Sequence, residues 1–242
     1  MITKTYKNLE EFNGKHAGIP AFVVGSGPSI HGLDLAPLAN YVTIAVNAGY
    51  VAVPNADYYV SDDEDVAVWS YFSHDLRKSN KTTVLLYEDK LADKAEWFGE
   101  RAVLFRHREG YNITDKYEHK NRPNHILQCR TSAGSAIHIA HIMGCSPIII
   151  LGLDCARVRA FRWFWQFPDW KNKPRRLDGK KADKYKHVKQ TSDSDLNSIL
   201  EYWRTQGREI NKKCVVYNAS EISKVDVFPK MKLDDVLEMI NA

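Results

Sequence analysis

Short apolar runs alternate with helical patterns along this chain of 242 residues. The runs are rich in Val and Ile and bounded by turn residues, which is typical of β-strands. Several are apolar at successive positions rather than at alternate ones, as in strands that helices cover on both faces of a parallel sheet. We therefore predict strands at residues 21–25, 41–47, 57–61, 82–87, 101–106, 147–154 and 213–218.

Three further segments have the apolar spacing of helices. Residues 131–144 place apolar side chains on one helix face and end at Gly144, a residue type that commonly stops a helix. Residues 192–207 do the same and end at Gly207, and a short helix follows at 233–240. Strands and helices together predict a Rossmann-like α/β fold, with a mostly parallel sheet and helices on both faces.

The composition suits one soluble domain. With 44% hydrophobic residues the chain can bury a sizeable core, and a single α/β domain over residues 1–242 is the natural expectation. No stretch approaches the roughly 18 apolar residues of a membrane span, and the N-terminus lacks the apolar part of a secretory signal. The four cysteines form no CxxC pair, which favours buried free thiols. We expect a cytoplasmic protein.

The positive charge is concentrated in one segment. The net charge is +4, yet residues 157–189 hold twelve Lys or Arg against three Asp, about +9, which leaves about −5 for the rest of the chain. The segment follows a predicted strand end, so we expect it to overhang a ligand pocket as a lid or acceptor platform that contacts an anionic substrate. The residues expected to make these contacts are Arg157, Arg159, Arg162, Trp163 and Trp165.

Two other interpretations of residues 157–189 stay open. The segment would equally suit a helical hairpin whose aromatic side chains pack on the body while its charges face water. A basic, aromatic composition would also suit contact with nucleic acid or a membrane surface.

The glycine-rich turn after the first predicted strand is the main candidate binding element. It reads Gly25-Ser26-Gly27-Pro28-Ser29 and should lie at the carboxyl edge of the sheet, where open α/β folds bind ligands. Its glycines would let backbone N–H groups approach a nucleotide or phosphate. The turn matches neither GxGxxG, because Ile30 occupies the third glycine position, nor the P-loop pattern. An ordinary strand-to-loop turn is the alternative.

The order of motifs resembles a known group of families. The turn VVGSGPSI, the strand end at Asn47, the acidic stretch ADYYVSDDED and the segment TSAGSAIHIAHIMGCSPIIILGLD resemble the MptE-like and flagellar-accessory families of unknown-function domain 115. They resemble more distantly the bacterial sialyltransferases that use CMP-sialic acid. The resemblance covers roughly residues 18–155 and implies nucleotide contacts from the matching positions. These are Gly25, Ser26, Gly27, Pro28, Ser29, Asn47, Thr131, Ser132, Ala133 and Gly134.

The sialyltransferase pattern is incomplete in this chain. Those enzymes place a Tyr two residues after the Asp that ends the GLD-type strand, where this chain has Ala156. Their His base precedes a Thr-Asp helix start, whereas Gln190 stands nearest that position here. His187, three residues earlier, is therefore the candidate base, with an incidental exposed His as the alternative. Asp154 is the second candidate for activating an acceptor hydroxyl.

Acidic residues follow two of the predicted strands. Asp62 and Asp63 come after residues 57–61, and Asp154 ends the strand 147–154, so all three should share the carboxyl edge. Asp62 and Asp63 are candidates for holding Mg²⁺ against a diphosphate, which the pterin pyrophosphokinases among the resembling families would need. Turn capping or simple exposure to water is the alternative.

These observations predict a transferase that uses a nucleotide-activated donor. The first expectation is a glycosyltransferase that takes a CMP- or UDP-sugar and an unidentified acceptor. A Mg²⁺-dependent pyrophosphokinase that uses ATP and a non-catalytic nucleotide-binding protein are the alternatives. The sequence leaves the acceptor and the oligomeric state open, a homo-oligomer included.

Overall fold

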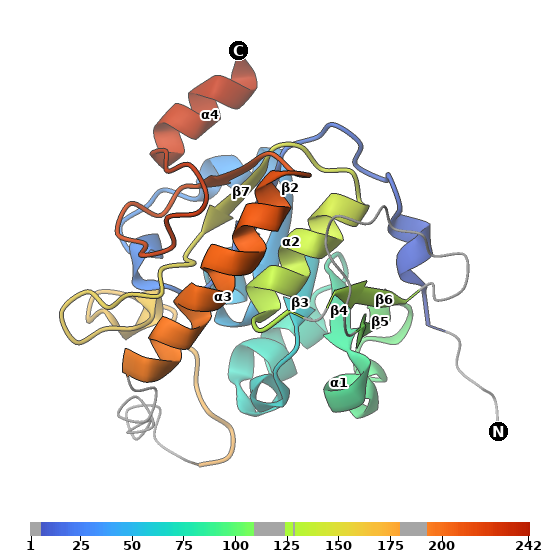
Figure 1. Ribbon diagram of the computed structural model, residues 1–242. Helices are drawn as coiled ribbons and strands as arrows, with labels where there is room; N and C mark the ends of the chain where they lie inside the picture. The colour runs from blue at the N-terminus through green and yellow to red at the C-terminus, as the bar shows by residue number, and fades with distance from the viewer. Residues whose placement is uncertain (1–5, 109–123, 128, 180–192) are drawn as a thin grey trace.

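Eight parallel strands form one sheet in the computed structural model, which describes residues 6–108, 124–127, 129–179 and 193–242 (Figure 1). The strand order is β6-β5-β4-β3-β2-β1-β7-β8, and all neighbouring pairs run parallel. The strands are β1 (Ala21–Val24), β2 (Val42–Val46), β3 (Tyr58–Ser61), β4 (Thr83–Tyr87), β5 (Ala102–Arg108), β6 (His125–Leu127), β7 (Ile148–Leu151) and β8 (Val216–Asn218).

The predicted Rossmann-like α/β fold is confirmed. Each predicted strand coincides with an observed one, within a few residues at its ends. β6 was not predicted, because three residues are too few to show a pattern.

Both faces of the sheet are buried, as the continuous apolar runs predict. Successive strand residues point to opposite faces, so that Val23 packs in one apolar cluster and Val24 in the other. The first cluster lies under α2 (Ser132–Ile142) and α3 (Asp193–Asn211), which cross the front of the sheet side by side in Figure 1. The second receives α1 (Glu88–Ala95) and α4 (Leu233–Asn241).

The predicted helix ends have mixed outcomes. α2 ends before Gly144, whose φ of +76° is the left-handed conformation expected of a helix stop. α3 continues through Gly207 to Asn211, so the predicted stop there was wrong. Gly207 is small for a packing reason, because an added Cβ would collide with Val227 and lie 3.3 Å from the Phe228 ring. Among the described helices, none is long and apolar enough to cross a membrane.

The described part of the basic aromatic segment, residues 157–179, packs against the body of the domain. Within it the helical structure is a single 3-10 turn, Phe164–Gln166, so these residues form no helical hairpin. Phe164, Trp165 and Phe167 are buried, as the packed alternative predicts. Farther along, the Ser70 backbone N–H donates to the Arg175 carbonyl at 2.8 Å. Residues 180–189 of the predicted lid lie outside the described residues.

Sheet order places a ligand crevice beside β1. β1 lies between β2 and β7, so the chain leaves β1 toward one half of the sheet and leaves β7 toward the other. In open α/β sheets the carboxyl ends of two such strands leave a crevice that commonly binds ligands. The turn after β1 lies at this point.

Candidate functional site

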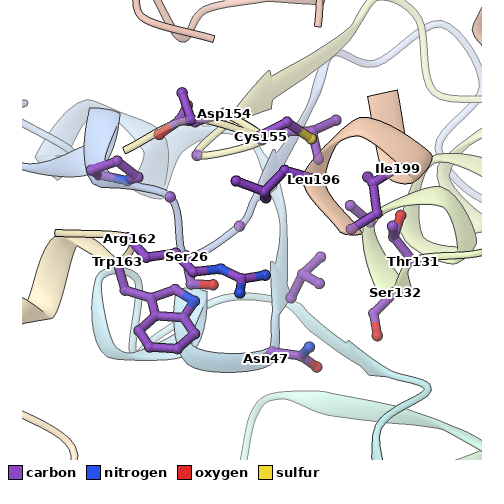
Figure 2. A pocket seen from close by; sticks show the side chains of 18 of the residues that line it. Ser26, Asn47, Thr131, Ser132, Asp154, Cys155, Arg162, Trp163, Leu196 and Ile199 are labelled. Carbon is purple, nitrogen blue, oxygen red and sulfur yellow. The ribbon is translucent and has the colours of Figure 1, made fainter. Parts of the chain in front are cut away.

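A pocket of about 290 Å³ opens at the crevice between β1 and β7 (Figure 2). Its walls come from the turns after β1, β2, β3 and β7, from the N-terminus of α2, and from the side of α3. Most of the predicted site residues meet here. Those that line the pocket are Gly25, Ser26, Gly27, Pro28, Asn47, Asp63, Thr131, Ser132, Ala133, Asp154, Arg162 and Trp163.

The glycines of the β1 turn lie where two loops approach each other closely. The N–H of Gly25 donates to the Leu151 carbonyl at 2.7 Å, and that of Gly27 donates to the Gly152 carbonyl at 2.9 Å. Gly27 has φ −65°, which any residue adopts, but an added Cβ would lie 2.7 Å from the Gly152 oxygen. These glycines therefore let two loops meet. Of the turn, the Ser26 N–H has no partner among the described residues.

Asp154 fastens the turn to the end of β7. Its Oδ2 accepts the backbone N–H of Ser29 at 2.7 Å, and its Oδ1 accepts the Ser29 hydroxyl at 2.7 Å. The side chain is buried, and this burial raises the pKa of Asp154 against the opposing effect of the Ser29 hydrogen bonds. Both carboxylate oxygens are thus engaged in holding Ser29. A catalytic role for Asp154 stays a prediction.

Asn47 lies in the pocket wall directly after β2. Its backbone is in the left-handed region, with φ +50°, where Asn is tolerated better than most side chains. Its side-chain Oδ1 is buried and has no hydrogen-bond partner among the described residues. An unpaired buried acceptor is costly, so a donor group on a ligand would stabilise it.

The N-terminus of α2 forms part of the pocket wall. Thr131 caps the helix, because its side-chain oxygen accepts the Gly134 N–H at 3.1 Å. Gly134 itself faces Cys129 and Tyr202 rather than the pocket. Free amides and the helix dipole make such an N-terminus a favourable place for a phosphate.

The basic aromatic segment contributes Arg162 and Trp163. In Figure 2 the Arg162 side chain reaches toward the middle of the pocket, and its guanidinium lies 5.2 Å from the centre of the Trp163 ring. Trp163 stacks on Trp165 at 5.4 Å, and Trp165 is buried against Trp69. The aromatic residues therefore form a fixed wall, in which Trp165 supports Trp163 from outside the pocket.

Two of the remaining predicted residues, Arg157 and Arg159, lie apart from the pocket. Arg157 and Arg159 are exposed on the turn between Ala156 and Arg162. The candidate base His187 lies outside the described residues.

The predicted magnesium ligands have separate surroundings. Asp63 lines the pocket and its Oδ1 accepts the Asp65 N–H at 3.0 Å. Asp62 does not line the pocket, and its Oδ2 accepts a hydrogen bond from the Ser135 hydroxyl at 2.6 Å. Within the described ranges, no group of three or more His, Cys, Asp or Glu side chains is arranged to hold a metal ion. Magnesium binding by this pair stays a prediction.

The sequence of this chain matches the profile of a known protein family. The profile of the family described as 6-hydroxymethylpterin diphosphokinase MptE-like matches residues 1–159. The chain belongs to this MptE-like family. The resemblance seen in the motifs is thereby confirmed. No curated protein matches the sequence.

A solved glycosyltransferase structure resembles this MptE-like chain in fold. The MAf glycosyltransferase from Magnetospirillum magneticum AMB-1 superposes with a TM-score of 0.56 and 12% identity, over 93% of this chain and 37% of that one. The chain thus spans little more than a third of that protein. The sialyltransferase CstII from Campylobacter jejuni, solved with the substrate analogue CMP-3FNeuAc, gives a TM-score of 0.48 and 15% identity over 88% of this chain and 86% of that one. At 12% identity, the likeness to the MAf glycosyltransferase shows a shared fold and nothing further.

Sequence reasoning missed the apolar side of the pocket. Leu196 and Ile199 of α3 and Cys155 after β7 line it, although none was predicted to. The α3 residues belong to a helical apolar pattern, which is equally typical of core packing. Burial raises the pKa of Cys155 to about 12, so its thiol stays protonated near neutral pH.

Proposed function

We propose that this MptE-like protein is a transferase that binds a nucleotide-activated donor in the β1–β7 pocket, and that the donor is a nucleotide sugar. One observation carries the proposal: the Ser26 turn, Asn47 and the N-terminus of α2 converge on the same pocket. Each offers a different group, namely an N–H donor, an amide acceptor and a helix terminus. Their combination suits a ligand with both a phosphate and hydrogen-bonding ring or sugar groups.

The charge and the size of the pocket suit a bound nucleotide, with the group to be transferred at the opening of the pocket. The α2 N-terminus and Arg162 favour a phosphate, while Leu196 and Ile199 offer an apolar wall for a base or sugar face. A pocket of about 290 Å³ lies at the small end of the range for small-molecule sites, roughly 300–1,000 Å³. A nucleotide would therefore occupy most of it, which leaves the group to be transferred near the acceptor.

Diphosphate transfer from ATP is the second candidate, because the family description names a diphosphokinase. That reaction would use Mg²⁺, and Asp63 is the member of the predicted carboxylate pair that lines the pocket. A protein that binds a nucleotide without turnover is the third.

Thermal-shift measurements against CMP, UDP, GDP, ATP and their sugar derivatives, each with and without Mg²⁺, separate the candidates. We expect the largest stabilisation from CMP or UDP and their sugars. Mg²⁺-dependent stabilisation by ATP alone would favour diphosphate transfer, and saturable binding without turnover would favour the binding protein. A protein that none of these ligands stabilises would refute the proposal.

A further inference from the structure

His31 connects the turn after β1 to the basic aromatic segment. It follows the 3-10 turn Pro28–Ile30, and its backbone N–H donates to the Pro28 carbonyl at 3.1 Å. Its ring stacks on that of Phe167, with 3.9 Å between the ring centres and 8° between the planes. Its Nε2 lies 2.9 and 3.0 Å from the two carboxylate oxygens of Asp169. A ring stack and a polar contact thus join two segments that are distant in the sequence.

Phe167 belongs to a compact turn that reaches the β1–β7 pocket. The Gln166 Oε1 atom accepts the backbone N–H of Arg162 at 2.7 Å and that of Trp163 at 3.0 Å. The Phe167 ring packs on the Phe161 ring, with 4.7 Å between their centres. Arg162 and Trp163 line the pocket, and Figure 2 shows the Arg162 side chain reaching into it. A contact that fixes Phe167 therefore also restrains the backbone of Arg162 and Trp163.

A backbone hydrogen bond also joins this compact turn to the turn after β1. The Phe164 N–H donates to the Ser26 carbonyl at 3.2 Å, and the Phe164 side chain is buried. The contact of His31 lies nearer the surface, because the His31 side chain is 27% exposed and that of Asp169 is 72% exposed. His31 therefore provides a further attachment of the segment, at a place where its imidazole exchanges protons with water.

Asp169 is the acidic group that His31 contacts directly. The hydrogen bond from His31 is the main cause that holds the pKa of Asp169 below its usual range, so this carboxylate is ionised near neutral pH. Lys173 acts on the pKa of Asp169 in the same direction. Three other charged side chains line the cavity beside His31, namely Glu221, Lys232 and Asp234. Among the residues that the structure describes, none of these three forms an ion pair with His31.

Protonation of the imidazole changes the strength of this contact. Histidine side chains gain a proton as the pH falls through the range from about 8 to 5. A protonated His31 forms an ion pair with Asp169, whereas a neutral imidazole that donates from Nε2 forms only a hydrogen bond. The attachment is therefore stronger at acidic pH. Because the pair is exposed, the gain is modest, on the order of two- to fivefold in an equilibrium constant.

We propose that His31 is a positioning residue of the β1–β7 pocket, which holds residues 161–167 against the turn after β1 and thereby places Arg162 at the donor phosphate. The role toward the donor rests on the proposed function. A guanidinium that is oriented before the ligand arrives loses less conformational freedom on binding. The contribution of His31 to nucleotide affinity should therefore be larger at pH 5.5 than at pH 7.5.

The attachment can be tested in the empty protein, whatever its function. We expect Asp169→Asn, and also His31→Phe, which keeps the ring stack, to speed hydrogen exchange of the Phe164 amide by about two- to fivefold at pH 5.5. After correction for the intrinsic exchange rate, NMR should find a smaller effect at pH 7.5. The exposed controls Asp226→Asn and His74→Phe should leave this exchange unchanged. Wild-type exchange in Asp169→Asn at pH 5.5, or an effect of equal size at both pH values, would overturn the proposal.

The consequence for the pocket is measured with whichever of CMP, UDP, GDP and ATP gives the largest thermal shift. Calorimetric titration should find that His31→Phe binds it about two- to fivefold more weakly than the wild type at pH 5.5, and nearer to the wild type at pH 7.5. Comparison at one pH cancels the ionisation of the nucleotide itself. Arg162→Gln should weaken binding at both pH values. In the double variant, His31→Phe should add no further loss, because it acts through Arg162.

The outcomes separate the two proposals. If no nucleotide stabilises the wild type, the proposed function fails, and hydrogen exchange still decides whether His31 holds residues 161–167. If a nucleotide binds and His31→Phe keeps the wild-type affinity at pH 5.5, His31 does not position Arg162. The same conclusion follows if His31→Phe weakens binding equally with and without the Arg162 side chain.

Discussion

Ser29 and Asp154 are joined by two hydrogen bonds of 2.7 Å each, one from the backbone N–H and one from the hydroxyl of Ser29. The pair holds the turn after β1 against the end of β7, where Asp154 lines the pocket. A buried carboxylate that receives two donors resists ionisation less than an isolated one. Burial nevertheless dominates, and the pKa of Asp154 is raised.

The raised pKa of Asp154 predicts a pH-dependent stability. The folded protein favours the protonated form of Asp154. The contribution of this preference to the free energy of unfolding is fully present below the ordinary pKa of 3.8, and it is lost as the pH rises through the pKa of the folded protein. Asp154→Asn cannot ionise. The unfolding free energy of the wild type minus that of Asp154→Asn, measured by urea titration, should therefore fall from about pH 3.5 to pH 7. The exposed control Asp235→Asn should show no such trend, and a constant difference for Asp154→Asn would contradict the prediction.

The close approach of the β1 and β7 turns predicts that Gly27→Ala lowers stability. The new methyl group would collide with the Asp154 carboxylate and the Gly152 carbonyl, although the backbone conformation suits alanine. We expect a loss of roughly 1–3 kcal/mol in the free energy of unfolding, with Ser26→Ala as the control in the same turn. Unchanged stability together with lost nucleotide binding would restore the view that Gly27 makes room for the ligand alone.

Two substitutions of Asn47 separate the effect of its backbone conformation on stability from the effect of its side-chain amide on nucleotide binding. Asn47→Ala should lower both stability and nucleotide affinity, since alanine disfavours φ +50° by roughly 1–2 kcal/mol. Asn47→Gly relieves the backbone and removes only the amide. It should therefore lower affinity by on the order of tenfold for the nucleotide that gives the largest thermal shift, with little change in melting temperature. Calorimetric titration that finds wild-type affinity in Asn47→Gly would assign Asn47 to the turn alone.

The contacts of Arg175 and Arg176 predict slow proteolysis within the basic segment. The Arg175 carbonyl accepts the Ser70 N–H, and Arg176 is paired with Asp178 and lies over the Trp69 ring. Trypsin should therefore cut after these residues more slowly than after the exposed Lys171. Trp69→Ala should speed the cleavage at Arg175 and Arg176. Rapid cutting there in the wild type, slowed by a nucleotide, would instead favour a closing lid.

The sequence predicted the parts of the fold that rest on strong local patterns. β1 and β7 are continuous apolar runs, and α2 repeats apolar side chains at the spacing of a helix. α1 was missed because only Leu91 and Ala95 of its eight residues are buried, so its apolar stripe is too thin to recognise. Gly207 was misread because its need for a small side chain arises from Val227, far along the chain from the helix pattern.

The same limit applies to the site. Gly25 to Pro28, Asn47 and Thr131 were found because each follows a recognisable strand or starts a helix. The sequence did not show that these glycines also let two loops meet, because that role depends on the distance between the loops rather than on the turn itself. The contacts of His31 with Phe167 and Asp169 join two distant segments, and no local pattern connects such positions. Only the folded chain brings them together.

The pairing of β1 with β7 has a consequence for the order in which the molecule is completed. Ser29 and Asp154 are 125 residues apart along the chain, and such distant contacts form slowly because a long loop must close first. A nascent chain that ends before β7 holds β1 to β6 and the α2 N-terminus, but lacks the carbonyls that accept the Gly25 and Gly27 amides. The pocket therefore forms late in folding. The proposed nucleotide would bind complete chains but not chains that end before β7.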